Sequence, residues 1–326
     1  MQQPFPSRPL VNPIIGLILL VGFSLLGLSL GTFVLGILSV LPYFDGDPVA
    51  ALLQINQMTS NNDFSHPHAW EIVMIVQAFS SFGGFILAAW IYLFFIEGKT
   101  LRSINTNAKI DFIPLLLIVF LGLAFIILNE WIYQWNRNWD LPDWLSGFED
   151  WSRSQQEKLG ELTQFLTNFD SFSRLIIALI VIAVLPAIGE ELMFRAAMQS
   201  IFLRWFRNPH AAVWVTGAIF SFIHFQLDGF IPRLLLGVVF GYLYVWSGNI
   251  WYAIWAHFIN NGVTVLGVFF NKSEKTKIDL EHTEWITWSQ ALIAAVISSV
   301  ILWYLKRLFD QYSQPNQSIS EEYNYR

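Results

Sequence analysis

The stretch LIIALIVIAVLPAIGEELMFR, residues 175–195, decides which kind of fold this chain can adopt. Its first eleven residues carry no charge, yet Glu190, Glu191 and Arg195 follow closely behind them. An ionised side chain at membrane depth costs about 2.5–3.5 kcal/mol on insertion scales. A chain keeps such groups in an apolar stretch if they pair with one another or if they take part in chemistry. The remaining sequence has to distinguish these two roles.

The composition places the whole chain in a membrane. Of its 326 residues, 55% are hydrophobic, 17% are aromatic and only 13% are charged, whereas a soluble domain has about 25% charged residues. The net charge of −6 comes without a basic stripe, so a nucleic-acid partner is not expected. The absence of cysteine excludes disulfides, thiolate metal sites and a cysteine nucleophile.

Eight segments are predicted to span the membrane, which takes about 20 mostly apolar residues. They are residues 13–41, 70–96, 112–134, 171–188, 211–226, 230–247, 249–270 and 286–307. The sequence therefore predicts an all-α polytopic membrane protein with about eight helices around a polar intramembrane site. No small-residue cleavage site follows the N-terminal residues, so we expect the first segment to be a retained span rather than a signal peptide.

The chain divides into three predicted parts: N-terminal spans over residues 1–169, a core over 170–270, and a final span with a polar tail over 271–326. The first part ends in a tryptophan-rich stretch, residues 134–170. Tryptophan favours the lipid–water boundary, so this stretch is predicted to be an interfacial loop or an amphipathic helix. A lid over the substrate is the alternative. The tail after Tyr312 has the composition of a disordered segment.

The distribution of Lys and Arg indicates an orientation by the positive-inside rule. With the N-terminus inside, the interior loops carry Arg8, Lys99, Arg102, Lys109, Arg204, Arg207, Lys306 and Arg307. The exterior loops then carry Arg137, Arg153, Lys158, Lys272, Lys275 and Lys277. This mild excess predicts that both termini are cytoplasmic, with Glu190 near the cytoplasmic end of the fourth span. A bacterial plasma membrane fits this pattern.

The first polar constellation is Glu190-Glu191-x-x-x-Arg195. Pro186 and Gly189 interrupt the preceding span, so a new helix is expected to begin around Gly189. Glu191 and Arg195 are four residues apart and share a helical face, which favours an ion pair. Glu190 points about 100° away and can face a different partner. The structural alternative is a membrane-edge helix whose charges reach solvent.

Two further constellations lie downstream in apolar segments. His224 follows Phe220 at a spacing of four, and Asn261 follows His257 at the same spacing, with Asn260 as a weaker competitor for the same role. Taken singly, His224 could be a core histidine bonded to a backbone carbonyl. The other pair could be part of a hydrogen-bonded cluster between helices.

Taken together, these groups are the parts of a hydrolytic site. A carboxylate can act as the base that deprotonates water, and histidine and asparagine donors can stabilise the tetrahedral oxyanion. No Gly-x-Ser-x-Gly nucleophile elbow is present. No cofactor is required by this reading. A divalent metal such as zinc stays open as an alternative, with Glu190, His224 and His257 as its ligands.

The three motifs, in this order and spacing, resemble those of the CAAX protease and bacteriocin-processing (CPBP) family, which includes the type II CAAX prenyl endopeptidases. The resemblance covers about residues 170–270. It implies an intramembrane endopeptidase with an all-helical fold and a site open to the cytoplasm. It further implies Glu190 as the base, Glu191 as its support held by Arg195, and His224 as a contact to water or peptide. His257 and Asn261 would stabilise the oxyanion, and Phe220 would pack beside the site.

The resemblance does not define the substrate. Relatives in eukaryotes cut after a prenylated cysteine, whereas bacterial ones are linked to bacteriocin processing, to self-immunity or to unknown membrane peptides. We therefore expect a membrane-associated peptide or protein as the partner. The alternative function is a non-catalytic immunity or scaffold protein that uses the same fold. A proton-coupled transporter is a more distant alternative, because the two halves of the chain show no internal repeat.

Overall fold

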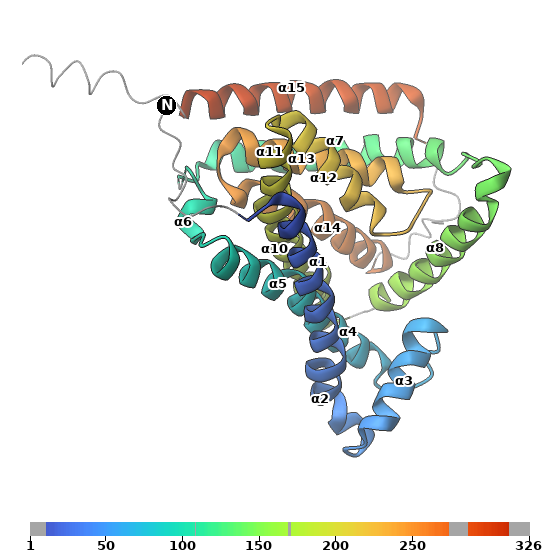
Figure 1. Ribbon diagram of the computed structural model, residues 1–326. Coiled ribbons are helices and arrows are strands. Elements are labelled where there is room, and N and C mark those ends of the chain that lie inside the picture. Colours follow the sequence, from blue (N-terminus) through green and yellow to red (C-terminus); the bar gives the residue numbers. More distant parts are fainter. Residues whose placement is uncertain (1–10, 108, 169–170, 274–285, 313–326) are drawn as a thin grey trace, which may run out of the picture.

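The computed structural model describes residues 11–107, 109–168, 171–273 and 286–312. Within these ranges all regular structure is helical, which confirms the all-α prediction (Figure 1). Seven helices in the described residues are long and apolar enough to cross a membrane. The predicted polar tail after Tyr312 lies outside the described residues. The polytopic membrane fold is therefore confirmed.

The first two spans are built from α-helical segments interrupted by π-helical turns, and the first span ends in a 3₁₀ turn. The first contains α1 (Pro13–Ser29), η1 (Leu30–Gly36), α2 (Ile37–Val40) and η2 (Leu41–Phe44). The second contains α4 (Ala69–Ser81), η3 (Phe82–Leu87), α5 (Ala88–Ile91) and η4 (Tyr92–Ile96). Between them lies α3 (Pro48–Ser60), which forms with α2 the lobe at the bottom of Figure 1.

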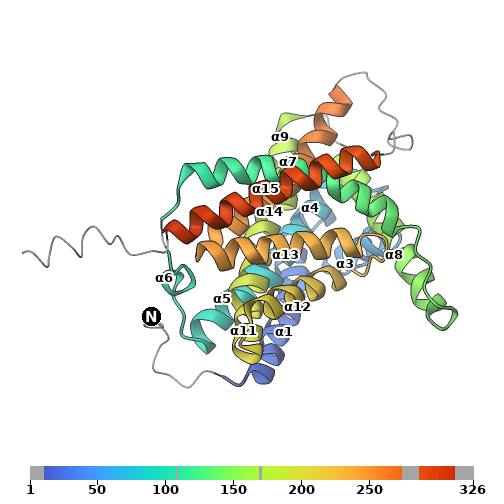
Figure 2. The same cartoon turned by 90° about the horizontal axis from the view of Figure 1, so that it is seen from above.

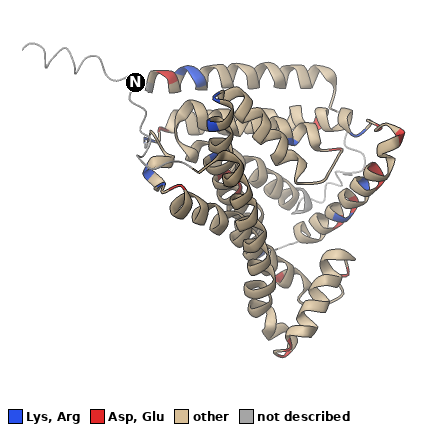
Figure 3. Ribbon diagram, in the orientation of Figure 1, with Lys and Arg blue, Asp and Glu red and all other residues tan. Residues whose placement is uncertain are grey.

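The middle of the chain contains α6 (Leu101–Ile104), the third span α7 (Phe112–Asn136), η5 (Asp143–Leu145) and α8 (Ser146–Thr167). The tryptophan-rich stretch is thus largely helical, as one of its two predicted forms required. Trp144 on η5 is 80% exposed. Figure 3 shows that charged residues are frequent along α8 and sparse within the bundle.

The fourth span is one continuous helix, formed by α9 (Phe172–Ala178), η6 (Leu179–Val184), α10 (Leu185–Glu191), η7 (Leu192–Gln199) and α11 (Ser200–Phe206). The prediction of a break near Gly189 is wrong. Pro186 lies in the first turn of α10, directly after the π-helical turn η6, where the wider backbone accommodates a residue without an N–H. Because the span runs on to Phe206, Glu190 lies near its middle and not at its end.

The C-terminal half contains α12 (Pro209–Phe222), α13 (Phe230–Ser247), α14 (Ile250–Ser273) and α15 (Trp288–Tyr312). Seen from above, α7, α13 and α15 run side by side (Figure 2). The predicted span at 211–226 corresponds to α12, whose 14 residues extend about 21 Å at 1.5 Å each, less than the roughly 30 Å hydrocarbon core. This helix is therefore short for a complete span.

Glycines bring the first span close to the second. A Cβ atom at Gly27 would collide with the backbone oxygen of Gly83, and one at Gly83 would collide with that of Gly27. Small residues at such crossings let membrane helices pack backbone to backbone. One hydrophobic core contains Leu20 of the first span together with Phe194 of the fourth span and Ile254 of α14. The N-terminal spans therefore support the helices that carry the motifs.

Candidate active site

The ion pair predicted between Glu191 and Arg195 is present at the centre of the bundle. Arg195 Nη1 donates to Glu191 Oε1 at 2.9 Å, and the two side chains are 0% and 1% exposed. Both residues belong to the continuous fourth span, on one face of the helix, as their spacing of four indicates. Taking both charges out of water is costly, so the pair needs further partners.

Those partners come from α12 and α13. Arg195 Nη2 donates to the carbonyl oxygen of Gly237 at 2.9 Å. Its guanidinium carbon lies 4.8 Å from the ring centre of Phe220 and 5.4 Å from that of Phe240. Aromatic faces attract cations, most strongly where water is excluded. Arg195 therefore fixes the fourth span against two neighbouring helices.

His257 on α14 connects the two carboxylates. Its Nδ1 lies 2.7 Å from Glu191 Oε1, and its Nε2 lies 3.8 Å from Glu190 Oε2. The ring stacks on Phe240 with 5.1 Å between ring centres. A carboxylate on one ring nitrogen sets the tautomer and orientation of the other. Glu191 thus holds both Arg195 and His257.

Glu190 occupies the other side of the helix, as its 100° offset predicts. Its side chain is 15% exposed, against 0% for Glu191. No hydrogen bond of its carboxylate is formed with the described residues, and its neighbour is the Nε2 edge of His257. The two carboxylates therefore differ: Glu191 is fully buried and binds both Arg195 and His257 through Oε1, whereas Glu190 has no such bond among the described residues.

His224 lies just beyond the end of α12, in the connection to α13 and outside the candidate spans. Its Nδ1–H donates to the Phe220 carbonyl oxygen at 2.8 Å, which leaves Nε2 available. The Phe220 ring makes edge contacts with both His224 and His257, at 5.3 and 6.1 Å between centres. Burial, reinforced by Arg233, lowers the pKa of His224 to about 4, so its ring is neutral at pH 7.

Asn261 is anchored to the fourth span. Its Nδ2 donates to the carbonyl oxygen of Ile182 at 3.2 Å, and its Oδ1 accepts from Asn260. The residue four positions after Ile182 is Pro186, which has no N–H to offer that carbonyl. Asn261 supplies a donor in its place. The structure shows no direct hydrogen bond between Asn261 and the Glu190–His257 pair.

Sequence reasoning missed several of these partners. The Gly237 carbonyl, the Phe240 ring and the Ile182 carbonyl were not foreseen, because backbone acceptors and ring contacts leave no motif. The sequence did contain one indication: Pro186 has no N–H, so the carbonyl oxygen of Ile182, four residues earlier, lacks its α-helical hydrogen bond. The oxyanion role of His257 stays a prediction and falls to Nε2, because Nδ1 is bound to Glu191.

The proposed metal ligands do not form a metal site here. In the described part of the chain no group of three or more His, Asp or Glu side chains is placed to hold a metal ion. Glu190 and His257 are adjacent, with 3.8 Å between Oε2 and Nε2, but the described structure does not bring His224 into one ligand group with them. The three residues as placed therefore do not form a zinc site.

Comparison with known proteins confirms the resemblance for the central part of the chain. Residues 172–263 match the family model described as "Type II CAAX prenyl endopeptidase Rce1-like". This segment carries all three motifs, and its match is consistent with the CPBP family. The resemblance is thus to a family of CAAX-type proteases.

A curated relative is the uncharacterised protein YpbD of Bacillus subtilis (strain 168). It is 30% identical over 110 residues, which are 32% of this chain and 53% of the relative. The match therefore spans about half of the relative's length. No solved structure matches the chain.

Proposed function

We propose that the protein is an intramembrane endopeptidase in which Glu190 activates a water molecule. The observation that carries the proposal is the different surroundings of the two adjacent carboxylates, Glu190 and Glu191. Glu191 is fully buried and bound by Arg195 and His257, whereas Glu190 lies beside Nε2 of His257 and forms no hydrogen bond with the part of the chain that the structure describes. The match of this segment to a protease family adds independent support.

The geometry leaves a position for the reacting water. Glu190 Oε2 and His257 Nε2 are 3.8 Å apart, beyond direct hydrogen-bond distance. A water oxygen about 2.8 Å from each atom closes a triangle with that 3.8 Å side. Such a water is polarised by both groups, and Glu190 is the group proposed to take its proton.

In the proposed reaction, Glu190 takes a proton from this water as the water oxygen attacks the peptide carbonyl carbon. The carbonyl π electrons move to the oxygen, which becomes the oxyanion. Glu190 then returns the proton to the leaving amine, and the C–N bond breaks. Asn261 uses one amide hydrogen for Ile182 and retains the second for the oxyanion. The free Nε2 of neutral His224 accepts a hydrogen bond from the water or the peptide N–H.

The substrate proposed is a membrane-associated peptide or protein, of CAAX-like or bacteriocin type. The membrane is proposed to be a bacterial plasma membrane with both chain termini cytoplasmic, as the Lys and Arg distribution favours. The division into parts 1–169, 170–270 and 271–326 remains a prediction. The protease match at 172–263 falls inside the central part.

The experiment is cleavage in proteoliposomes, with a prenylated CAAX peptide and a panel of membrane peptides read out by mass spectrometry. Wild type should cleave, and Glu190→Ala and His224→Ala should not, although both variants insert and fold. Normal cleavage by purified Glu190→Ala would contradict the proposal. The alternative, a non-catalytic immunity or scaffold protein, predicts that a strain carrying Glu190→Ala keeps its phenotype.

A further inference from the structure

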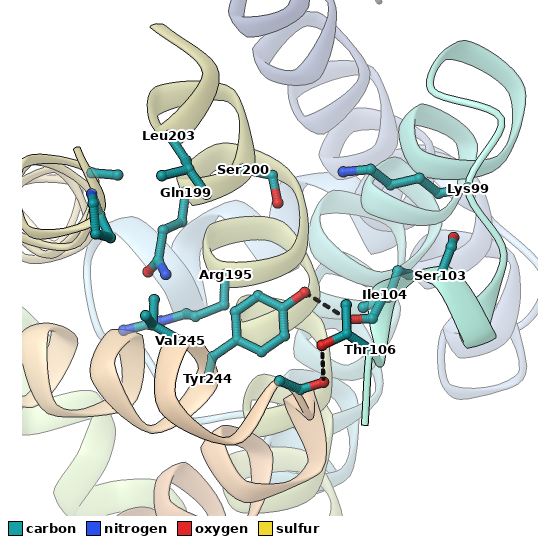
Figure 4. Close-up of a pocket in the computed structure, with 13 residues that line it drawn as sticks. Lys99, Ser103, Ile104, Thr106, Arg195, Gln199, Ser200, Leu203, Tyr244 and Val245 are labelled. Carbon is teal, nitrogen blue, oxygen red and sulfur yellow. Dashed lines mark hydrogen bonds between the residues drawn. The ribbon is translucent and has the colours of Figure 1, made fainter. Parts of the chain in front are cut away.

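A cavity of about 260 Å³ lies apart from the Glu190 site, where three candidate spans end (Figure 4). Its wall comes from the segment after η4, from η7 and α11, and from the ends of α12 and α13. Arg195 lines it, but Glu190, His224, His257 and Asn261 do not. The cavity is therefore distinct from the candidate active site and touches it only through Arg195.

Beside the cavity, two cations share a single carboxylate, which leaves an excess of one positive charge. Glu97 is 1% exposed and binds Arg204 through both oxygens, at 2.6 and 3.0 Å, and also accepts from Tyr92. Lys99 faces the same carboxylate only at 3.6 Å. Two cations thus share one anion, and Lys99 lines the cavity with 16% of its side chain exposed. Burial lowers the pKa of Lys99, and the nearby Arg204 adds to this, against the attraction of Glu97.

Donor groups on the opposite wall are also left unused. Arg195 Nε is buried and has no hydrogen-bond partner. Gln199 is 4% exposed, and its amide makes one long bond of 3.4 Å to the Gly241 carbonyl, with Oε1 unpaired. Figure 4 shows Lys99 on one side of the cavity and Arg195 and Gln199 on the other, with Ser200 between them. The Gln199 amide has a second hydrogen beyond the one given to Gly241, which a ligand in the cavity can accept.

The cavity is preformed. The Tyr244 hydroxyl donates to the Ile104 carbonyl at 2.8 Å, and the Thr106 hydroxyl donates to the Gly248 carbonyl at 3.3 Å (Figure 4). These bonds tie the segment after η4 to the end of α13. They hold this part of the wall in place, and Lys99, Gln199 and Ser200 all line the cavity.

We propose that this cavity binds a phosphate-type oxyanion. A tetrahedral anion offers several acceptor oxygens, which the Lys99 ammonium, the Gln199 amide N–H and the Ser200 hydroxyl can each meet with one donor. The Arg195 guanidinium in the wall adds its positive charge. The volume excludes a large organic ligand. Because the cavity lies at the ends of the spans, the phosphate can belong to an anionic lipid headgroup or to a free ion. The proposal does not rest on peptidase activity.

The test measures binding by the purified full-length protein. In detergent, inorganic phosphate should raise the midpoint of thermal unfolding, followed by tryptophan fluorescence, relative to chloride at equal ionic strength. In nanodiscs of phosphatidylcholine with or without phosphatidylglycerol, the anionic lipid retained after detergent exchange is counted by native mass spectrometry. Lys99→Met should weaken binding about tenfold or more, because a charge-assisted bond is lost. Lys109→Met, an exposed lysine outside the cavity, should not.

A second variant covers the case in which Lys99→Met does not fold. Ser200→Leu leaves Lys99 in place and fills the cavity, and it should also abolish binding. Phosphate binding lost in these variants identifies a free-anion site. Phosphatidylglycerol retention lost in them identifies a lipid-headgroup site. Either result supports the proposal. It is overturned if neither probe binds, or if both variants bind as wild type does.

Discussion

Removing Arg195 tests whether the buried carboxylate cluster is held as the structure shows. Arg195→Met leaves Glu191, 0% exposed, with His257 as its remaining charge-bearing partner. Breaking a buried pair by deleting one member costs about 3–5 kcal/mol, because the other charge stays buried and uncompensated. We expect a loss of that size in the free energy of unfolding.

A double-mutant cycle separates this coupling from lost packing. Glu191→Gln keeps an acceptor for His257 and removes the charge. The loss of stability in the double variant Glu191→Gln/Arg195→Met should then be smaller than the sum of the two single losses by at least about 2 kcal/mol. The effects of substitutions within one interaction network do not add. The assay is denaturant unfolding in mixed micelles, followed by tryptophan fluorescence. Additive losses would refute the reasoning.

The matched control is the exposed pair Lys306–Asp310, which has the same spacing of four and an Nζ–Oδ2 distance of 2.6 Å. Its side chains are 49% and 57% exposed. The same cycle there should give about 0.5 kcal/mol or less, because water and salt screen surface pairs. Comparable coupling in both cycles would mean that burial of the Glu191–Arg195 pair has no energetic consequence.

Three further predictions concern packing, the α8 contact and pH. Gly27→Ala should prevent stable assembly because its Cβ meets the facing helix backbone, whereas Gly22→Ala, with open space, should be tolerated; size-exclusion profiles report both. Ser152→Ala should cost about 1–3 kcal/mol in thermal unfolding, because the partly buried Leu227 N–H and Phe225 carbonyl each lose a hydrogen bond to the Ser152 hydroxyl. The His224 ring should protonate near pH 4 by NMR. Between about pH 6.5 and 4 the unfolded chain binds a proton at His224 that the folded chain does not. The free energy of unfolding should therefore decrease as the pH is lowered through this window. His224→Gln should reduce this decrease.

Much of the fold could be predicted from the sequence because the membrane imposes a length on apolar segments. The Glu191–Arg195 pair and the separate orientation of Glu190 follow from helical geometry alone, and both are present. The clustering of Phe220, His224 and His257 was expected from their order and their apolar surroundings, and their ring contacts bear it out.

The remaining features depend on the backbone and on tertiary contacts. Pro186 suggested a helix break, but the π-helical turn before it lets the helix continue, and the carbonyl it releases is taken by Asn261. Gly189 has a packing role: a Cβ there would lie 2.8 Å from the Cβ of Phe85. A sequence pattern records neither of these contacts, because each depends on which helix lies alongside.

The most direct test of the central claim is the cleavage rate of Glu190→Gln in proteoliposomes. Glutamine keeps the size and polarity of the side chain and removes the base. Loss of a general base lowers the rate by about 10²–10⁴-fold, and the exposed control Glu130→Gln should cleave like wild type. A Glu190→Gln variant that cleaves as fast as Glu130→Gln would show that Glu190 is not the water-activating carboxylate.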